Sequence, residues 1–193
     1  MLIRGATGGD AQGILSIYGP IIENSTISFE TEIPCPDSFS NRIENVVREF
    51  PWLIAELDGC IAGYAYAGAY RKREAYQWSV ETSVYVNESF RRRGVAKSLY
   101  HVLFELLIEM GFVNAYAGIT QPNVPSQKTH ESFGFAFLGS YDKVGYKFGQ
   151  WHDVIWLQKA LRPHPQNPAK PLRWDTFKST DAALKIMGAG GSP

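Results

Sequence analysis

The chain has 193 residues, of which 45% are hydrophobic, enough to bury one sizeable core but too few for a second domain of similar size. Lysine plus arginine balance aspartate plus glutamate at 19 each, so no overall charge attracts nucleic acid or an acidic membrane surface. Cys35 and Cys60 suit neither a disulfide scaffold nor a metal site, and no apolar run approaches the roughly 20 residues of a membrane span. We therefore expect a cytoplasmic protein without a metal, a nucleic-acid partner or a membrane association.

The first part of the chain predicts a strand followed by two short helices. Residues 2–6 suit a strand, and Asp10 is expected to cap a helix that Pro20 interrupts. Residues 25–36 contain threonine, serine and two prolines, which favour a loop. Asp37 is then expected to open the second helix.

The middle of the chain predicts an α/β domain with a mixed sheet. Asp58-Gly59 separates two apolar runs and suits the tight turn of a β-hairpin. Periodicity predicts strands at residues 52–57, 60–66, 77–86, 115–119, 135–140 and 154–161, and helices at 94–110 and 125–133. The strand, helix and strand from residue 77 to residue 119 form a βαβ unit.

The chain after Leu161 is rich in proline and ends in a glycine-rich stretch, residues 188–193. We interpret residues 1–161 as one domain and residues 162–193 as a tail. The tail also contains apolar residues that suit docking on the domain or on a partner subunit, and the sequence leaves the choice open: Trp174, Phe177, Leu184, Ile186 and Met187.

A basic turn between a strand and a helix indicates an anion site. Arg91-Arg92-Arg93-Gly94 precedes the helix that starts near residue 94. The first N–H groups of a helix have no internal partner and its dipole is positive there, which favours a pyrophosphate. Gly94 and Ala96 leave the backbone accessible, and Lys97 adds positive charge. A solvated run of charges is the alternative, but the glycine spacing favours a site.

These residues resemble the GNAT superfamily of N-acetyltransferases. Arg91, Gly94 and Ala96 match its cofactor motif, and a second motif is matched by Asn123, Ser126, His130, Gly134 and Phe135, with histidine in place of tyrosine. The resemblance implies a mixed, mostly antiparallel sheet of six to seven strands flanked by about four helices. It also implies acetyl-CoA as cosubstrate, and a bulge in residues 82–86 that frees backbone groups for the pantetheine arm. The implied cofactor-binding residues are Val84, Tyr85, Val86, Arg91, Arg92, Arg93, Gly94, Val95, Ala96, Lys97, Ser98, Asn123 and Ser126.

The resemblance is closer to the phosphinothricin acetyltransferase family and covers residues 3–161. It rests on residues 78–86, 122–126, 130–135 and 145–154. It implies direct transfer of an acetyl group to the α-amine of phosphinothricin or a close analogue, a homodimer, and herbicide resistance. The implied acceptor-binding residues are Phe29, which we expect to be buried, Arg71, Arg73 and Tyr76.

The same resemblance implies Glu81 as the general base that takes a proton from the acceptor ammonium. Alternation along the strand alone favours an ordinary exposed glutamate there. His130 is implied in proton transfer, as an acid toward the CoA thiolate or as a base toward the amine, and a purely structural histidine is the alternative. For His152 we favour a structural role over a proton relay.

Two other functions compete with this interpretation. An enzyme of the same fold acting on methionine sulfoximine or methionine sulfone differs only in its acceptor. A non-catalytic acyl-CoA sensor would need neither Glu81 nor His130. A nucleotide-dependent oxidoreductase does not fit, because the early strand is not followed by GxGxxG.

Overall fold

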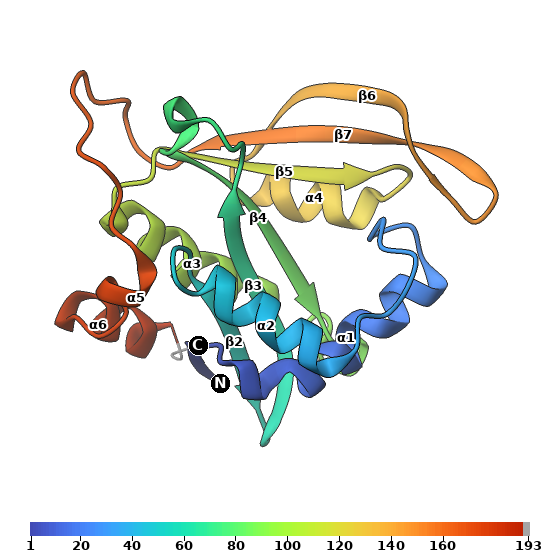
Figure 1. Ribbon diagram of the computed structural model, residues 1–193, viewed down its shortest axis with the longest axis horizontal. Coiled ribbons are helices and arrows are strands. Elements are labelled where there is room, and N and C mark those ends of the chain that lie inside the picture. Colours follow the sequence, from blue (N-terminus) through green and yellow to red (C-terminus); the bar gives the residue numbers. More distant parts are fainter. Residues whose placement is uncertain (191–193) are drawn as a thin grey trace.

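The computed structural model describes residues 1–190, so the last residues of the predicted glycine-rich stretch, 191–193, lie outside it. Within residues 1–190 the chain forms a seven-stranded sheet in the order β1-β2-β3-β4-β5-β7-β6 (Figure 1). The strands are β1 (Leu2–Gly5), β2 (Trp52–Leu57), β3 (Cys60–Ala69), β4 (Ser79–Val86), β5 (Asn114–Thr120), β6 (Ala136–Lys147) and β7 (Gln150–Ala160). The α-helices are α1 (Ala11–Asn24), α2 (Pro36–Val46), α3 (Val95–Met110), α4 (Val124–Ser132), α5 (Trp174–Phe177) and α6 (Asp181–Ala189). The pairing of β4 with β5 is parallel and the other pairings are antiparallel, which confirms the predicted mixed sheet.

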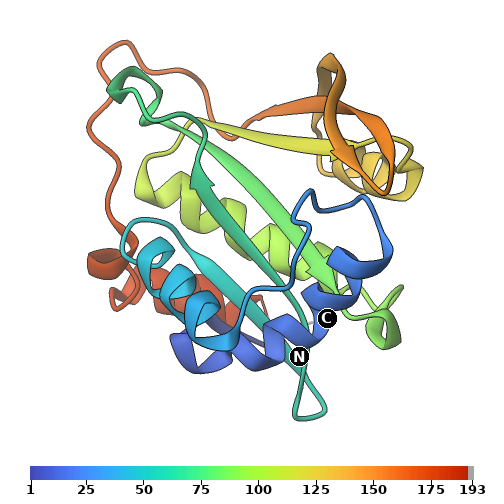
Figure 2. The same cartoon turned by 45° about the vertical axis from the view of Figure 1, so that its right-hand side comes forward.

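Helices cover both faces of the sheet, as the two views in Figures 1 and 2 show. Successive residues of β2 point to opposite faces, because side chains alternate along a strand. Leu53 belongs to the apolar cluster around α3, whereas Ile54 belongs to the cluster around α1 and α2. Burial of both faces explains why the central strands are almost continuously apolar.

Most predicted elements are confirmed, and the Asp58-Gly59 turn has the expected positive φ angles of 54° and 76°. The strands at the C-terminal edge are longer than predicted. β6 and β7 extend to Lys147 and Gln150, and Phe148-Gly149 forms their turn with φ angles of 51° and 75°. Residues 145–154 are therefore a second hairpin.

The predicted interruption at Pro20 is wrong, because α1 continues through it to Asn24. Pro20 itself is exposed, while Ile17, Tyr18 and Ile22 on either side of it are buried. A proline inside a helix costs about 3 kcal/mol, and burying several large side chains offsets a cost of that size.

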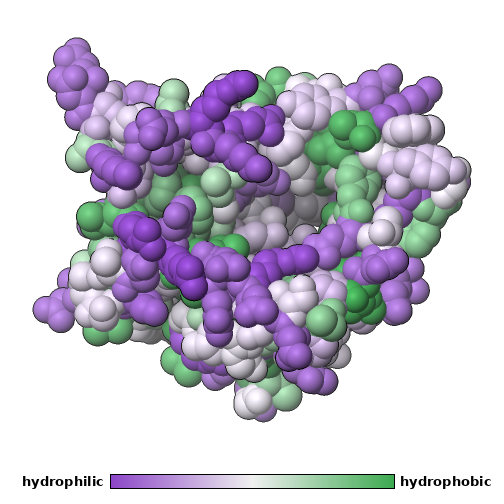
Figure 3. All heavy atoms as spheres, in the orientation of Figure 1, coloured by the Kyte–Doolittle hydropathy of each residue, from purple (hydrophilic) through white to green (hydrophobic). Residues whose placement is uncertain are grey.

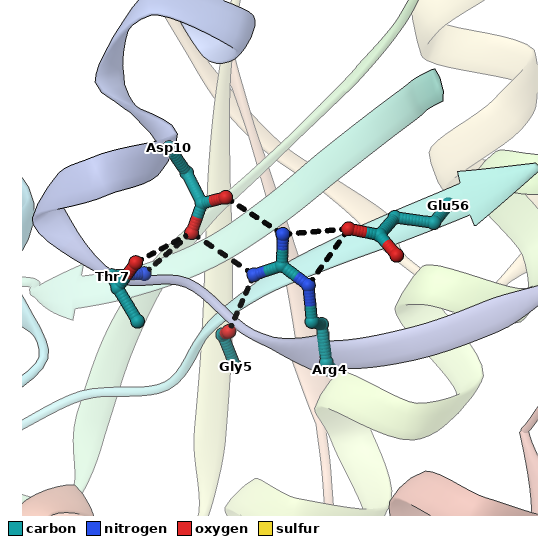
Figure 4. A network of polar contacts seen from close by, with 5 residues as sticks. All are labelled: Arg4, Gly5, Thr7, Asp10 and Glu56. Atoms are coloured by element: carbon teal, nitrogen blue, oxygen red, sulfur yellow. Dashed lines mark hydrogen bonds and ion pairs between the residues drawn. The ribbon is translucent and has the colours of Figure 1, made fainter. Parts of the chain in front are cut away.

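Asp10 occupies the predicted N-cap position of α1, but its side chain makes no capping hydrogen bond to the helix. Its carboxylate accepts hydrogen bonds from the backbone N–H and the hydroxyl of Thr7, and it forms an ion pair with Arg4 at 2.7 Å (Figure 4). Arg4 also binds Glu56 of β2 at 2.6 Å. This network joins β1, β2 and the start of α1.

The tail packs on the domain. Its two helices, α5 and α6, raise the number of α-helices within residues 1–190 to six, where about four were predicted. Trp174 is only 1% exposed and joins the cluster around α3 together with Phe177 and Ala183, whereas Leu184 is exposed. The backbone N–H groups of Leu172 and Trp174 donate to the carbonyl oxygens of Met110 and Glu49. A search of the helices within residues 1–190 finds none with the length and apolarity of a membrane span.

Candidate active site

The sheet opens between β4 and β5. The two strands pair only from Ser79–Asn114 to Glu81–Tyr116, and beyond that point β4 continues beside β3 while β5 continues beside β7 (Figures 1 and 2). The pairing of β3 with β4 keeps one register from Ala69–Val80 to Gly63–Val86, so the expected bulge in residues 82–86 is wrong. The strands separate by diverging, which leaves one edge of β4 unpaired after Glu81.

A small cavity of about 50 Å³ lies in this opening. We call this cavity the wedge. Its lining comes from β4, β5, α4 and the loop after α1, and it comprises Ile27, Thr82, Ser83, Val84, Tyr85, Gly118, Ile119, Thr120, Asn123, Ser126 and His130. The ring of Tyr85 packs away from α3 against Tyr18 and Tyr64, with centroids 5.3 and 5.0 Å apart. Asn123 caps α4 by accepting a hydrogen bond from the N–H of Ser126 at 3.2 Å.

The predicted anion site lies at the start of α3. Gly94 precedes the helix with a φ angle of 79°, a backbone conformation that residues other than glycine rarely adopt. The space around Gly94 is open. The turn and one side of α3 line a cavity of about 980 Å³. The predicted cofactor residues on this cavity are Val86, Arg91, Arg92, Gly94, Val95, Ala96 and Lys97. The exposed N–H groups, the positive helix end and the adjacent cavity fit a pyrophosphate with an attached nucleotide.

Some of the other predicted cofactor residues line the wedge, and the rest line neither cavity. Val84, Tyr85, Asn123 and Ser126 line the wedge, whereas Arg93 and Ser98 lie outside both cavities. The guanidinium of Arg93 instead stacks over Phe90 at 5.4 Å.

His130 is buried on α4, and both ring nitrogens are engaged. Nδ1 lies 2.8 Å from the carbonyl oxygen of Ser126, which only accepts, so Nδ1 carries the proton. Nε2 therefore accepts the hydrogen bond from the hydroxyl of Tyr100 at 2.9 Å. Burial lowers the pKa of His130, although the bond to Ser126 acts in the opposite direction, and the ring is neutral near pH 7. Tyr100 is a site neighbour that the motifs alone did not reveal.

Glu81 lies where β4 and β5 begin to separate, and it shares a sheet face with its partner Tyr116. Its side chain is half-buried. Burial raises the pKa of the Glu81 carboxyl, and the nearby charge of Arg71 lowers it in part. A carboxylate with a raised pKa at the point where two strands separate suits a general base.

Arg71 is held by an aromatic group on the same side of the sheet. Its guanidinium stacks over Tyr70 at 4.7 Å and over Trp156 at 5.9 Å, and its Nη2 lies 3.4 Å from the hydroxyl of Tyr141. Tyr70 stacks in turn on Tyr116 with centroids 4.0 Å apart. We did not predict this aromatic group, because its members are spread over β5, β6, β7 and the loop after β3.

The remaining predicted acceptor residues, Arg73, Tyr76 and Phe29, do not all lie in one place. The rings of Tyr76 and Tyr70 lie 6.0 Å apart, and Arg73 lines a cavity of about 630 Å³ beneath the tail, which Arg71 also lines. The expected burial of Phe29 is wrong, because it is 38% exposed and lies beside the ring of His152 at 6.3 Å. His152 Nε2 lies 3.0 Å from the carbonyl oxygen of Lys147 in the same hairpin.

The face of the molecule seen in Figure 3 is hollowed between the β5–β7 strands and the α1–α2 layer, with hydrophilic side chains along much of the rim. A polar acceptor therefore has an open approach to this face. Within the described range 1–190, His, Cys, Asp and Glu side chains form no group of three or more that would hold a metal.

Comparison with known proteins identifies the family. Residues 3–156 match the model of the acetyltransferase (GNAT) domain. Phosphinothricin N-acetyltransferase of Streptomyces viridochromogenes is 39% identical over 171 residues, which cover 88% of this chain and 93% of that protein. L-methionine sulfoximine/L-methionine sulfone acetyltransferase of Pseudomonas aeruginosa is 33% identical over 171 residues, covering 86% and 98% of the two chains.

A solved structure shows the same arrangement. The phosphinothricin acetyltransferase of Sinorhizobium meliloti, crystallised in complex with acetyl-CoA, superposes with a TM-score of 0.81 at 27% identity, covering 89% of this chain and 97% of that one. The comparisons confirm the predicted fold and the predicted enzyme class, an N-acetyltransferase with acetyl-CoA as cosubstrate. The chain belongs to the GNAT family of acetyltransferases.

Proposed function

We propose that this protein transfers the acetyl group of acetyl-CoA to the α-amine of phosphinothricin or a close analogue, and thereby confers resistance to that herbicide. The observation that carries the proposal is the position of Glu81, a half-buried carboxylate with a raised pKa at the point where β4 and β5 separate. The similarity to phosphinothricin acetyltransferases supports the choice of acceptor.

Acetyl-CoA supplies the electrophilic thioester carbonyl. The start of α3 would hold its pyrophosphate through Gly94 and the following N–H groups, with Arg92 and Lys97 adding charge. The unpaired edge of β4 from Val84 to Val86 would receive the pantetheine arm. Both cysteines are exposed and lie off the two cavities, so the proposal needs no acetyl-enzyme.

Glu81 would take a proton from the acceptor ammonium, directly or through a water molecule, because only the neutral amine attacks the thioester. Arg71 would bind the carboxylate or phosphinate of the acceptor, since its fork of N–H donors matches such oxygens. Its aromatic neighbours hold the guanidinium without neutralising its charge. We extend this acceptor-binding assignment to Arg73, Tyr76 and Phe29 on the resemblance alone.

His130 would take part in proton transfer together with Tyr100, whose hydroxyl carries the one proton of the pair that can move to the departing thiolate and would then regain a proton from solvent. The one N–H of the neutral imidazole is directed at Ser126. Its other nitrogen, Nε2, is the only one that can accept a proton, and it already accepts the hydrogen bond from Tyr100. A proton reaches the wedge from this pair only if the Tyr100 hydroxyl turns away from Nε2. This arrangement favours a shared role for the pair over a direct contact by His130.

A homodimer is supported by the second hairpin. β6 is the edge strand of the sheet, and it and its turn expose large apolar side chains: Tyr146, Phe148 and Trp151 are 59%, 57% and 60% exposed. Sedimentation of the protein as a monomer at micromolar concentration would contradict this part of the proposal. We also propose a cytoplasmic location, where acetyl-CoA is available.

A CoA-release assay tests the function. Phosphinothricin, methionine sulfoximine, methionine sulfone, common amino acids, polyamines and a peptide amine are compared at equal concentration. The methionine analogues are the second candidates, since three relatives named as acetyltransferases of these compounds are 28%, 32% and 33% identical to this chain. Turnover of phosphinothricin with the highest kcat/KM supports the proposal. Turnover confined to the methionine analogues would show that these compounds, and not phosphinothricin, are the acceptors. Binding of acetyl-CoA without turnover of any amine would refute catalysis and favour an acyl-CoA sensor.

A further inference from the structure

Lys147 is an internal cation at the end of β6. Its side chain is only 4% exposed, and its ammonium group donates to the carbonyl oxygens of Ile22, Ser25 and Ser28 at 2.7, 2.9 and 2.8 Å. An ammonium has three N–H donors, so each has a partner. Within residues 1–190 no carboxylate lies within ion-pair distance of this group. Three carbonyl dipoles therefore compensate a charge whose burial is otherwise costly.

The three carbonyl groups lie far from Lys147 in sequence but close together in the fold. Ile22 is in the last turn of α1, where the helix dipole is negative and favours a cation. Ser25 and Ser28 belong to the loop that follows, in which residues 25–35 adopt neither helix nor strand. Such a loop has no ladder of backbone hydrogen bonds to hold it. Its position depends on side-chain anchors, among them Lys147, the 2.7 Å hydrogen bond between Tyr18 and Ser28, and the ion pair between Glu30 and Arg42.

The anchored loop forms part of the candidate active site. Ile27 lies between the two serines that Lys147 holds, and it lines the wedge together with Thr82 and His130. Ile27 also lines a neighbouring cavity together with Val86 and the cofactor turn at Arg91. A displacement of residues 25–28 would therefore change the wall of the cleft where the two substrates meet.

We propose that Lys147 is a positioning residue that clamps residues 25–28 to the β6–β7 hairpin and thereby sets Ile27 as one wall of the wedge. The side chain acts on the reaction through Ile27, since Lys147 itself is enclosed by carbonyl groups. The kinetic part of this inference rests on the proposed function, whereas the clamp itself does not.

The first test is hydrogen exchange of Lys147→Met, a substitution that keeps an unbranched side chain without the terminal ammonium and so removes its donors. We expect amides of residues 25–30 to exchange at least about tenfold faster, while α3 and β4 keep their protection. Lys143→Met, at an exposed lysine of the same strand, is the matched control and should leave the pattern unchanged. Unchanged exchange of residues 25–30 in Lys147→Met overturns the clamp. If this variant does not fold, Lys147→Gln, which keeps two donors, takes its place.

The second test is a double-mutant cycle with Ile27→Ala. Each single variant should lower kcat/KM for the acceptor by about tenfold and change the acetyl-CoA Kd by less than about threefold, and the double variant should lose little more than either. Fully additive losses would show that Lys147 does not act through Ile27. If the wild type acetylates no amine, the proposed function fails alone, because the exchange experiment still decides whether the clamp exists.

Discussion

Replacing Glu81 with glutamine removes the proposed base and preserves the size of the side chain. General-base catalysis contributes about 10²- to 10⁴-fold to a rate. Glu81 is half-buried, so water can partly replace the base and the loss should lie near the lower end. We expect kcat to fall about 100-fold, which corresponds to about 2.7 kcal/mol. The acetyl-CoA Kd should stay nearly unchanged, because the proposed pyrophosphate site begins beyond the end of β4.

The pH dependence gives this prediction a second, independent readout. The base acts only when deprotonated, so kcat/KM should fall as the pH drops through the pKa of Glu81. Burial raises that pKa, and the acid limb should therefore lie above the ordinary glutamate range. Arg71 lowers the same pKa, so Arg71→Met should move the limb to higher pH, and Glu81→Gln should abolish it.

The measurements are steady-state CoA release from about pH 5 to pH 9 and calorimetric titration with acetyl-CoA. Glu109→Gln, the same substitution at an exposed position of α3, is the control and should behave as the wild type. Turnover of Glu81→Gln within about twofold of the wild type, or an acid limb that survives in this variant, would refute the assignment.

Three further predictions address the cofactor site, the tail and the Arg4 network. Gly94→Ala should weaken acetyl-CoA binding several-fold in a calorimetric titration and leave the acceptor KM nearly unchanged. The positive φ at the start of α3 costs alanine about 1 kcal/mol, and the backbone change that relieves this strain would move the N–H donors for the pyrophosphate. Trp174→Ala should lower the free energy of unfolding by about 3 to 5 kcal/mol in urea titrations, since the tail indole is almost fully buried, and a loss below about 1 kcal/mol would show that the tail does not stabilise the domain. Asp10→Asn should destabilise by about 1 kcal/mol at neutral pH, because the ion pair with Arg4 is partly exposed. Partial burial acts to raise the pKa of Asp10, but the hydrogen bonds from Arg4 and Thr7 lower it overall. The contribution of Asp10 to stability is therefore complete above its unfolded pKa of about 3.9, and it is lost as the pH falls through the lower pKa of the folded state. Urea titrations in acid should therefore show the difference between Asp10→Asn and the wild type disappearing.

The parts of the site that sequence reasoning located are those encoded by local spacing. Gly94 at the start of α3 and the order of strand, turn and helix are short-range features, and the structure places them as predicted. The aromatic group around Arg71 was missed for the opposite reason. Tyr70, Tyr141 and Trp156 come from three separate segments, so no motif or period brings them together in the sequence.

The wrong predictions have a similar explanation. Pro20 breaks an isolated helix, yet the packing of its buried neighbours against α2 and the sheet keeps α1 continuous. Phe29 is hydrophobic and was expected to be buried, but the loop that carries it lies over an edge hairpin and leaves one side of the ring exposed. In both cases burial depends on contacts with distant segments.

The sequence alone determined the fold class, the family, the glycine turn at the start of α3 and the position of Glu81 in its strand, because these follow from side-chain periodicity, turn chemistry and motif spacing over a few residues. The tertiary structure decided where β4 and β5 separate, which groups surround Glu81 and Arg71, how the tail packs, and that Lys147 is enclosed by three carbonyl groups. The partners in these arrangements are distant in the chain, and only packing brings a buried charge and the groups that compensate it to the same place.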